Sequence, residues 1–506
     1  MSGTEVSELM PDEPVGIVEQ VVIEPVVVVE TVIAESLVTE TVISESVSSE
    51  SVSSGSVISE PVSSEPAVSE PAVSELALGE LFGALDDPAL NSMNLLNEIA
   101  NRYPNAVSLA AGRPCEDSFD LAALGRYLER FCEYLRTELG YSEQLVRRTL
   151  FQYGRTKGIV HELIAANLAQ DEGISVDPEA IVVTVGCQEA MYLVLRALRR
   201  GPEDVVLAVA PTYVGLTGAA RLADLPVLPV QAGAGGVDLA DLAEQLHRAR
   251  ASGLRPRACY LMPDFANPSG LTMDLDLRRR LLALARAENI LLLEDNPYGL
   301  FPLDLDNRLP TLKALDDSHT VVYLGSFAKT VLPGARVGYL IADQPVRDGA
   351  GGSSLLADQL SKLKSMLTVN TSPISQAIVA GKLLEHGCSL IAATASDRAV
   401  YANNLRLMLD GLAIRFSDQH TGVSFNAPAG SFFVVVTVPF EVDDALLEHS
   451  AADYGVLWTP MHHFYAAGSA VNSLRLSCSV VTPDEVELGL DRLADLIYDR
   501  LAKSST

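Results

Sequence analysis

Apolar residues occur along most of the chain in short runs separated by segments of helical spacing. From residue 180 onward, the runs AIVVTVG, DVVLAVAPTY, ACYLMPDFANPSG, ILLLEDNPY and TVVYLGSF are rich in apolar residues and end in Gly, Pro or a polar or aromatic residue. The segments CQEAMYLVLRALRRG and LRRRLLALARAENI, which lie between these runs, have the apolar spacing of a helix. This alternation predicts a buried, mostly parallel sheet with helices on both faces.

The rest of the body mixes helices with strands such as GSFFVVVTVP and SLRLSCSV, which predicts a second, smaller α+β domain. A chain of 506 residues suits such a multidomain fold. We expect an N-terminal arm with part of the small domain over residues 81–145 and the large domain over 146–350. A linking helix is expected over 351–385 and the small domain over 386–506.

The first 80 residues have a different pattern. Glutamate recurs every five residues from 30 to 50 and again from 60 to 80, in units such as ESVSS and EPAVS. A period of five matches neither a helix nor a strand, so the valines do not align on one face. The segment has 16 acidic residues and no Lys or Arg. We expect residues 1–80 to form a disordered, solubilising tail; a partner-binding tail is the alternative.

Charge and composition exclude several classes of function. The net charge of -30 opposes binding to nucleic acid or to anionic membranes, so neither partner is expected. No apolar run reaches the length of about 18 residues that indicates a membrane helix, and the N-terminus lacks the pattern of a secretory signal. The six cysteines are scattered without a CxxC pair, which is typical of reduced thiols. We therefore expect a cytoplasmic protein, and we expect no metal site.

Five successive predicted strands end near a residue that can bind a ligand. These residues are Cys187 and Gln188 in TVGCQEAM, Tyr213 in APTY, Asn267 in DFANPSG, Asp295 and Tyr298 in EDNPY, and Ser326 and Lys329 in GSFAK. Each has a structural alternative, such as a plain turn, a buried tyrosine or a helix cap. Ligands bind at the carboxyl ends of strands in open α/β sheets, so the five together indicate one site. A lysine beside a buried strand is also costly unless a ligand engages it.

The motifs TxGxQxA, PTY, NPxG, EDxPY and SFxK followed by PGxRVG resemble those of the fold-type-I aminotransferases, which depend on pyridoxal phosphate (PLP). The resemblance covers roughly residues 90–500. It is closest to the branch of aminoadipate, kynurenine and aromatic aminotransferases, and it extends to the arylglycine aminotransferases of antibiotic biosynthesis. It implies a seven-stranded type of sheet, PLP as cofactor, and ping-pong transfer of an amino group between an L-amino acid and a 2-oxo acid.

The resemblance also implies a role for each matching residue. Lys329 would form the Schiff base with PLP and move the proton, Asp295 would keep the pyridine nitrogen protonated, and Tyr213 would stack on the ring. Further cofactor contacts would come from Asn267, Tyr298, Ser326, Arg336, Cys187, Gln188 and, across a homodimer interface, Tyr153. Substrate contacts would come from Arg475, Gly112, Asn267 and Arg113. Cys187 departs from the family's pattern, since a serine is common there.

The substrate side chain is expected to meet the segments LAAGRP and WTPMHHFY. The second segment is rich in aromatic residues although aromatic residues make up only 6% of the chain, which favours an aromatic or arylglycine side chain; a packed aromatic cluster is the alternative. Arg113 is a candidate for the distal carboxylate of glutamate or 2-oxoglutarate, or an ordinary surface arginine.

Two other functions remain open. One is a different PLP reaction on the same fold, catalysed by a β-lyase, a decarboxylase or a synthase. The other is a non-catalytic regulator, but that would need a basic DNA-binding domain where this chain has its acidic repeat.

Overall fold

The computed structural model describes residues 76–87, 90, 92, 98–116, 119–233, 235–349, 351–466, 469 and 471–504. The chain divides into two units, Met1–Ser74 and Glu75–Thr506, and all described residues belong to the second. The tail expected over residues 1–80 therefore lies almost wholly outside the described residues. In its last part, Leu78–Glu80 form a 3-10 helix.

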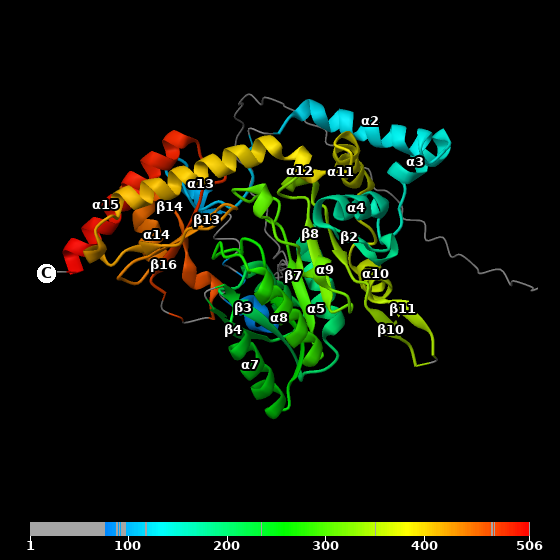
Figure 1. The fold of residues 1–506 in the computed structure, drawn as a ribbon, viewed down its shortest axis with the longest axis horizontal. Helices are drawn as coiled ribbons and strands as arrows, with labels where there is room; N and C mark the ends of the chain where they lie inside the picture. The colour runs from blue at the N-terminus through cyan, green and yellow to red at the C-terminus, as the bar shows by residue number, and fades with distance from the viewer. Residues whose placement is uncertain are drawn as a thin grey trace, which may run out of the picture. The chain divides into compact units, whose positions relative to one another are not determined.

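An eight-stranded sheet forms the centre of the second unit (Figure 1). Its strand order is β2-β9-β8-β7-β6-β3-β4-β5. Strands β8, β7, β6, β3 and β4 are parallel, whereas β9 runs antiparallel to both of its neighbours and β5 runs antiparallel to β4. The strands are β2 (Ile181–Thr184), β3 (Asp204–Ala210), β4 (Val227–Gly233), β5 (Gly236–Val237), β6 (Arg255–Leu261), β7 (Leu291–Asp295), β8 (Val321–Ser326) and β9 (Gly338–Ile341).

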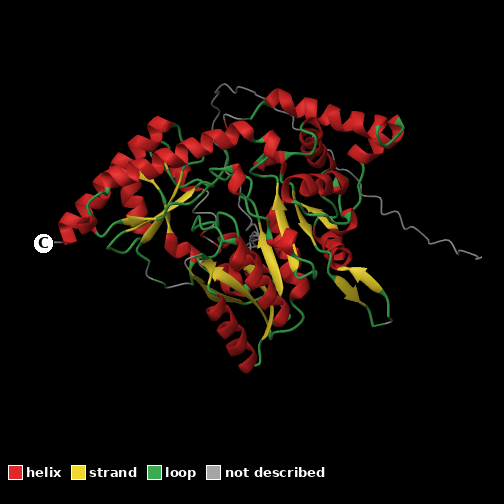
Figure 2. Ribbon diagram, in the orientation of Figure 1, coloured by secondary structure: helices red, strands yellow, loops and turns green. Residues whose placement is uncertain are grey.

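Helices cover both faces of this sheet because successive strand residues point to opposite sides (Figure 2). In β3, Val206 and Ala208 belong to the core beneath α5 and α6, and Leu207 between them belongs to the core beneath α7 and α8. These helices are α5 (Gly186–Leu198), α6 (Val214–Leu222), α7 (Leu239–Ala251) and α8 (Leu275–Ala287). At the β2 end of the sheet, α4 (His161–Asn167) and α11 (Pro373–Glu385) contribute to a third core. Strands buried on both faces explain the nearly continuous apolar runs.

A smaller α+β layer is built mainly from the C-terminal part of the chain. It contains a four-stranded sheet in the order β12-β13-β16-β15, packed against α13 and α15, which run side by side (Figure 1). The N-terminal strand β1 pairs in parallel with β14 and so joins this layer. The bounds are β1 (Val107–Ser108), β12 (Ser424–Phe425), β13 (Phe433–Thr437), β14 (Val456–Leu457), β15 (Thr459–Pro460), β16 (Ser473–Ser477), α13 (Ala395–Arg415), α14 (Asp444–His449) and α15 (Pro483–Ser504).

The remaining helices follow local sequence signals. Helix α2 (Leu121–Thr137) begins where the Asp120 carboxylate accepts a hydrogen bond from the amide of Ala122, and α3 (Glu143–Phe151) follows it. The long helical region expected over residues 351–385 is divided into α10 (Leu356–Leu367) and α11. Pro373 occupies the first turn of α11, where its missing N–H costs nothing. Within the described ranges, no helix has the length and hydropathy that crossing a membrane would require.

Candidate active site

A cavity of about 830 Å³ opens at the carboxyl ends of the parallel strands. It brings together groups from all five strand ends noted in the sequence, together with residues of the small layer. Its lining includes Gly112, Arg113, Cys187, Gln188, Tyr213, Asn267, Asp295, Tyr298, Ser326, Lys329, Arg336 and Arg475. Apart from Tyr153, every residue expected at the site lines this one cavity.

Lys329 follows β8 and extends across the cavity. Its Nζ donates a hydrogen bond to the carbonyl oxygen of Gly112 at 2.8 Å, and no carboxylate of the described residues pairs with it. Burial removes water from the ammonium group, and the nearby charges of Arg475 and Arg336 oppose another positive charge. Together these effects lower the pKa of Lys329 to about 8. A substantial fraction of the amine is therefore neutral near physiological pH, which a nucleophilic lysine requires.

Asp295 is the last residue of β7 and is only 2% exposed. One carboxylate oxygen accepts a hydrogen bond from the Tyr260 hydroxyl at 2.6 Å, and the other lies 3.7 Å from the Cys187 sulfur, which donates to it. Burial raises the pKa of Asp295 to about 6, although both hydrogen bonds oppose that shift. A buried carboxylate with no cation paired to it suits a ligand that brings its own positive charge.

The start of α5 forms an anion cradle with Arg336 and Ser326. Gly186 has a φ of +71°, and a Cβ on it would lie only 2.7 Å from an Nη atom of Arg336, so glycine leaves room for this guanidinium. Cys187 and Gln188 occupy the first turn of the helix, where backbone N–H groups are free of intrahelical partners. An arginine, a hydroxyl and helix N-terminal amides together match a phosphate group.

Arg475 comes from β16 of the small layer and forms the opposite wall. Its two Nη atoms donate to Asn267 Oδ1 at 2.6 Å, to the Ala110 carbonyl at 2.9 Å and to Thr459 Oγ1 at 3.1 Å. Its Nε is buried without a hydrogen-bond partner. The guanidinium also lies over the ring of Phe433, with Cζ 4.3 Å from the ring centroid. Burial lowers its pKa to about 10, so it stays charged at neutral pH and can bind a carboxylate.

Two tyrosines border the same space. Tyr298 packs edge-on against Phe432 and Phe433, with centroids 5.4 Å from each. Tyr213 precedes α6 and lines the cavity. Burial raises the pKa of both hydroxyls, so both remain protonated donors at neutral pH.

Some expected residues lie elsewhere or have other partners. The ring of Tyr153 is not part of the lining, and this residue is 85% exposed. Arg113 reaches the cavity, but its side chain is largely exposed and pairs with Glu116 at 2.9 Å. In the WTPMHHFY segment only Phe464 lines the cavity. Trp458 is instead fully buried in the core of the small layer, where its indole N–H donates a hydrogen bond to the Ser450 hydroxyl.

The structure adds residues that the sequence did not indicate. Tyr260 contacts Asp295 because β6 and β7 are neighbours in the sheet. Phe433 and Phe464 both face the Arg475 guanidinium. No motif marks these side chains, and the adjacency of β6 and β7 that brings Tyr260 to Asp295 is known only from the structure.

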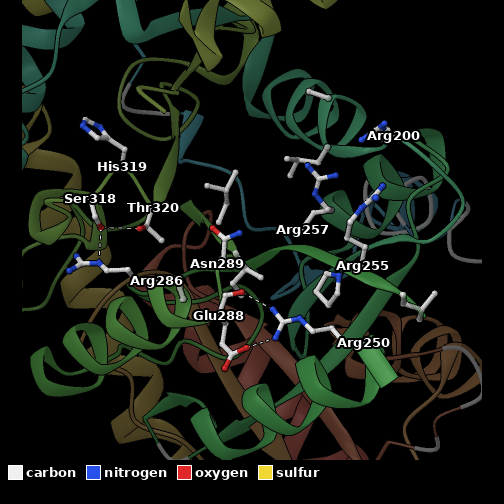
Figure 3. Close-up of a pocket in the computed structure, with 17 residues that line it drawn as sticks. Arg200, Arg250, Arg255, Arg257, Arg286, Glu288, Asn289, Ser318, His319 and Thr320 are labelled. Atoms are coloured by element: carbon white, nitrogen blue, oxygen red, sulfur yellow. Dashed lines mark hydrogen bonds and ion pairs between the residues drawn. The ribbon is translucent and has the colours of Figure 1, made fainter. Parts of the chain in front are cut away.

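A larger cavity, of about 1130 Å³, lies at the opposite, amino ends of β3, β6, β7 and β8 (Figure 3). It is rich in arginine, but four of its five arginines are paired with carboxylates. Arg250 pairs with Glu288 (Figure 3). Arg255 and Arg257 share the buried carboxylate of Asp204. Arg286 pairs with Asp317 beside Ser318. The described residues that line this arginine-rich cavity include no lysine and no buried carboxylate. The cavity around Lys329 is therefore the better candidate for chemistry.

Comparison with known proteins agrees with this choice. The profile of the family "Aminotransferase class I and II" matches residues 109–493. The chain is 58% identical to the (S)-3,5-dihydroxyphenylglycine transaminase of Amycolatopsis orientalis over 421 residues, which cover 83% of this chain and 94% of the relative. The Pyrococcus horikoshii kynurenine aminotransferase, solved with PMP, KYN and KYA, has a TM-score of 0.68 and 28% identity over 80% of this chain and 94% of its own. The alpha-aminoadipate aminotransferase of Thermus thermophilus, complexed with N-(5'-phosphopyridoxyl)-L-leucine, has the same TM-score and identity over 84% of this chain and 100% of its own.

Proposed function

The chain belongs to the class I and II aminotransferases, and from this premise we propose that its amino-acid substrate is an arylglycine, in which the aromatic ring is bonded directly to Cα. The family, the fold class and the PLP cofactor predicted from the motifs are confirmed. The protein is a PLP-dependent transaminase that takes an amino acid and a 2-oxo acid as substrates. The observation that carries the arylglycine proposal is the 58% identity to a dihydroxyphenylglycine transaminase.

The residues of the cavity fit PLP group by group. We assign the phosphate to Arg336, Ser326 and the first turn of α5, and the ring nitrogen to the buried Asp295. Lys329 is the lysine available for covalent attachment, because its pKa is lowered and it lacks a carboxylate partner among the described residues. When bound, PLP supplies an electron-withdrawing ring that stabilises negative charge at the substrate Cα.

The protein's own groups position the substrate and move its proton. We assign the substrate α-carboxylate to Arg475, whose unpartnered Nε and charged guanidinium favour an anion. Lys329 Nζ, with a pKa of about 8, can accept a proton from Cα and return it. Asn267 and Tyr298 are assigned to the ring hydroxyl, while Tyr213 is assigned to stacking.

The walls of the cavity suit an aromatic ring close to Cα. Ile99, Val214 and Phe464 provide apolar surface in the cavity, and the Phe464 ring lies beside the Arg475 guanidinium. Ser108 also lines the cavity, and its hydroxyl is buried without a hydrogen-bond partner. Because a buried hydroxyl without a partner is costly, we assign Ser108 to a hydroxyl on the ring of the substrate.

The proposal also covers the amino acceptor and the metabolic setting of the enzyme. Arg113 could receive the distal carboxylate of 2-oxoglutarate only if its ion pair with Glu116 opened. An arylglycine is not among the amino acids that ribosomes incorporate into proteins. We therefore place the enzyme in secondary metabolism, with antibiotic biosynthesis as the expected setting.

The test is to supply the holoenzyme with 2-oxoglutarate and a panel of amino donors. The measured quantity is the rate at which the 2-oxo acid of each donor forms. We expect kcat/KM for phenylglycine and 3,5-dihydroxyphenylglycine to exceed that for phenylalanine by about 10- to 200-fold, because an extra methylene displaces the ring. Lys329→Ala should lower turnover by about 10²- to 10⁴-fold. The control Lys362→Ala, at an exposed position of α10, should leave turnover unchanged. Equal or greater activity on phenylalanine would refute the arylglycine assignment, and turnover without any amino acceptor would favour a lyase or decarboxylase.

We also propose a homodimer in which Tyr153 reaches the phosphate site of the partner subunit. The high exposure of its ring in the single chain supports this role. Sedimentation velocity should give twice the mass of one chain, and Tyr153→Ala should weaken PLP retention. A fully active monomer would contradict the proposal.

A further inference from the structure

Two histidines and an aspartate converge outside the catalytic cavity. His462 and His463 lie in the 3-10 helix Met461–Phe464, and Asp444 is the first residue of α14. One donor atom from each residue lies within 4.8 Å of the other two. Nε2 of His463 is 2.8 Å from Asp444 Oδ1, and Nε2 of His462 is 3.6 Å from the same oxygen. In the part of the chain that the structure describes, this is the one such cluster of three.

The surroundings hold these donors in place. Nδ1 of His463 lies 2.9 Å from the hydroxyl of Ser92, which is 7% exposed. A hydroxyl that accepts a hydrogen bond from Nδ1 leaves Nε2 free to coordinate a metal ion. Met461 and Phe464, at the two ends of the 3-10 helix, are buried in a small apolar cluster with Val214. The two imidazoles therefore do not depend on a metal ion for their position.

Charge also favours a cation between these groups. The ring centroids of His462 and His463 are 4.1 Å apart, and both Nε2 atoms face a single carboxylate oxygen. A cation placed between them would be held by this carboxylate and by the ring nitrogens that face it, which are donors that a divalent transition metal accepts.

We propose that Asp444, His462 and His463 bind a divalent transition-metal ion of the zinc type, with a fourth coordination position open to water. Two imidazoles and one carboxylate are donors that zinc accepts, whereas calcium and magnesium prefer sites made entirely of oxygen. The Asp444 side chain is 47% exposed and that of His463 is 7% exposed, so the ion enters from the aspartate side. The sequence did not indicate this site, because Asp444 precedes the histidine pair by 18 residues.

The site would connect to catalysis through one residue. Phe464 follows His463, lines the catalytic cavity and lies 5.3 Å from the Arg475 guanidinium. Its carbonyl oxygen accepts a hydrogen bond from the amide of Thr212, the residue before Tyr213. A metal ion on the two histidines would therefore bind directly beside the wall against which we place the substrate.

The experiment uses the full-length, untagged holoenzyme, treated with EDTA, dialysed and titrated calorimetrically with zinc chloride. We expect one zinc ion per chain. His462→Gln and His463→Gln should each weaken binding at least about tenfold, and Ser92→Ala, which removes only the hydroxyl beside Nδ1, should weaken it by about 10- to 100-fold. The matched control is His449→Gln, because His449 pairs with Asp453 at 2.6 Å without a second imidazole; it should bind zinc like the wild type.

Two results would overturn the proposal: no stoichiometric zinc on the wild type, or wild-type affinity in both Gln variants. Circular dichroism and the spectrum of bound PLP report whether each variant is folded. If a histidine variant fails to fold, Asp444→Asn at the exposed ligand decides the question by the same criterion. Zinc should also raise the thermal unfolding midpoint of the wild type and of His449→Gln but not of the ligand variants.

Discussion

Lys329 lies within the electrostatic influence of Arg475 and Arg336 and has no carboxylate partner among the described residues. A charged lysine in this position destabilises the cofactor-free protein. The same arrangement yields a neutral amine at a pH where an ordinary lysine is protonated. The cost in stability and the reactivity of this residue thus have one cause.

The cost should appear in the pH dependence of stability. The pKa of Lys329 is about 8 in the folded protein, whereas an ordinary lysine exposed to water, as in the unfolded chain, has a pKa of 10.5. Below pH 8 both states hold the proton, so the cost is fully present. Between these values the unfolded state holds more protons, so the free energy of unfolding should rise with pH, by up to roughly 3 kcal/mol. Urea unfolding of the cofactor-free protein at pH 7.5 and 10 should show this rise relative to Lys329→Met.

The matched control for this measurement is Lys362→Met, in which an exposed lysine of α10 is replaced. Its stability should follow that of the wild type across the same pH range. A constant difference between the wild type and Lys329→Met would mean that Lys329 titrates normally.

Ser108 provides a second prediction at the residue scale. Its buried hydroxyl lacks a partner, and a hydroxyl on the substrate ring would supply one. Ser108→Ala should therefore lower kcat/KM for 3,5-dihydroxyphenylglycine by about 10-fold, the value of roughly one neutral hydrogen bond. Phenylglycine, which lacks ring hydroxyls, should be used equally well by both proteins. Equal losses on the two substrates would assign Ser108 to packing.

At the scale of the element, helix α8 supports the loop that presents Asn267. Arg278 of α8 is fully buried, and its two Nη atoms donate to the Asp264 carboxylate at 3.0 and 2.5 Å. It also donates to the carbonyl oxygens of Met273 at 3.0 Å and Pro310 at 2.9 Å. One side chain thus holds together the segments on either side of the loop 264–273.

Arg278→Ala should destabilise the protein by about 3–5 kcal/mol, because it leaves the Asp264 carboxylate buried without its partner. It should also raise KM, since Asn267 contacts Arg475 from this loop. Chemical unfolding and steady-state kinetics measure the two effects. Arg279→Ala, one residue along the helix on its exposed side, is the control, and an equal effect from it would contradict this account.

The sheet and most of its site residues could be predicted at this scale. The apolar runs in the sequence correspond to β2, β3, β6, β7 and β8. The residues that follow these strands lie together because parallel strands end at the same edge of the sheet. The pairing of β1 with β14 and the contact of Tyr260 with Asp295 depend on strand order, which no local pattern encodes. The division between α10 and α11 could have been inferred from Pro373.

At the scale of the whole molecule, the acidic N-terminal segment is separate from the catalytic machinery in sequence. Among the residues that the structure describes, those that line the catalytic cavity fall between Leu90 and Arg475. This segment nevertheless carries much of the negative charge, since residues 1–75 contain 15 acidic groups and no basic ones.

Deletion of residues 2–75 should leave kcat/KM within about twofold of the full-length value, because the residues assigned to the cofactor and the substrate all lie in the second unit, between Ser108 and Arg475. The deletion changes the formal net charge from -30 to -15. We therefore expect lower solubility at pH 7, where the truncated protein carries less net charge to keep its molecules apart. Steady-state assays and precipitation curves for the two proteins test this, and a large loss of turnover would mean that the segment contributes to the enzyme.

The pairing of β1 with β14 has a consequence for the order of folding. Val107 and Val456 are register partners although 348 residues separate them in the chain, and the next residues past this pairing include Ala110 and Gly112 of the cavity. During synthesis the eight-stranded sheet, complete by Ile341, can form on the ribosome before its C-terminal partners exist. The wall of the cavity that contains Arg475 is then assembled last, so a nascent chain has no complete cavity until it is almost fully translated.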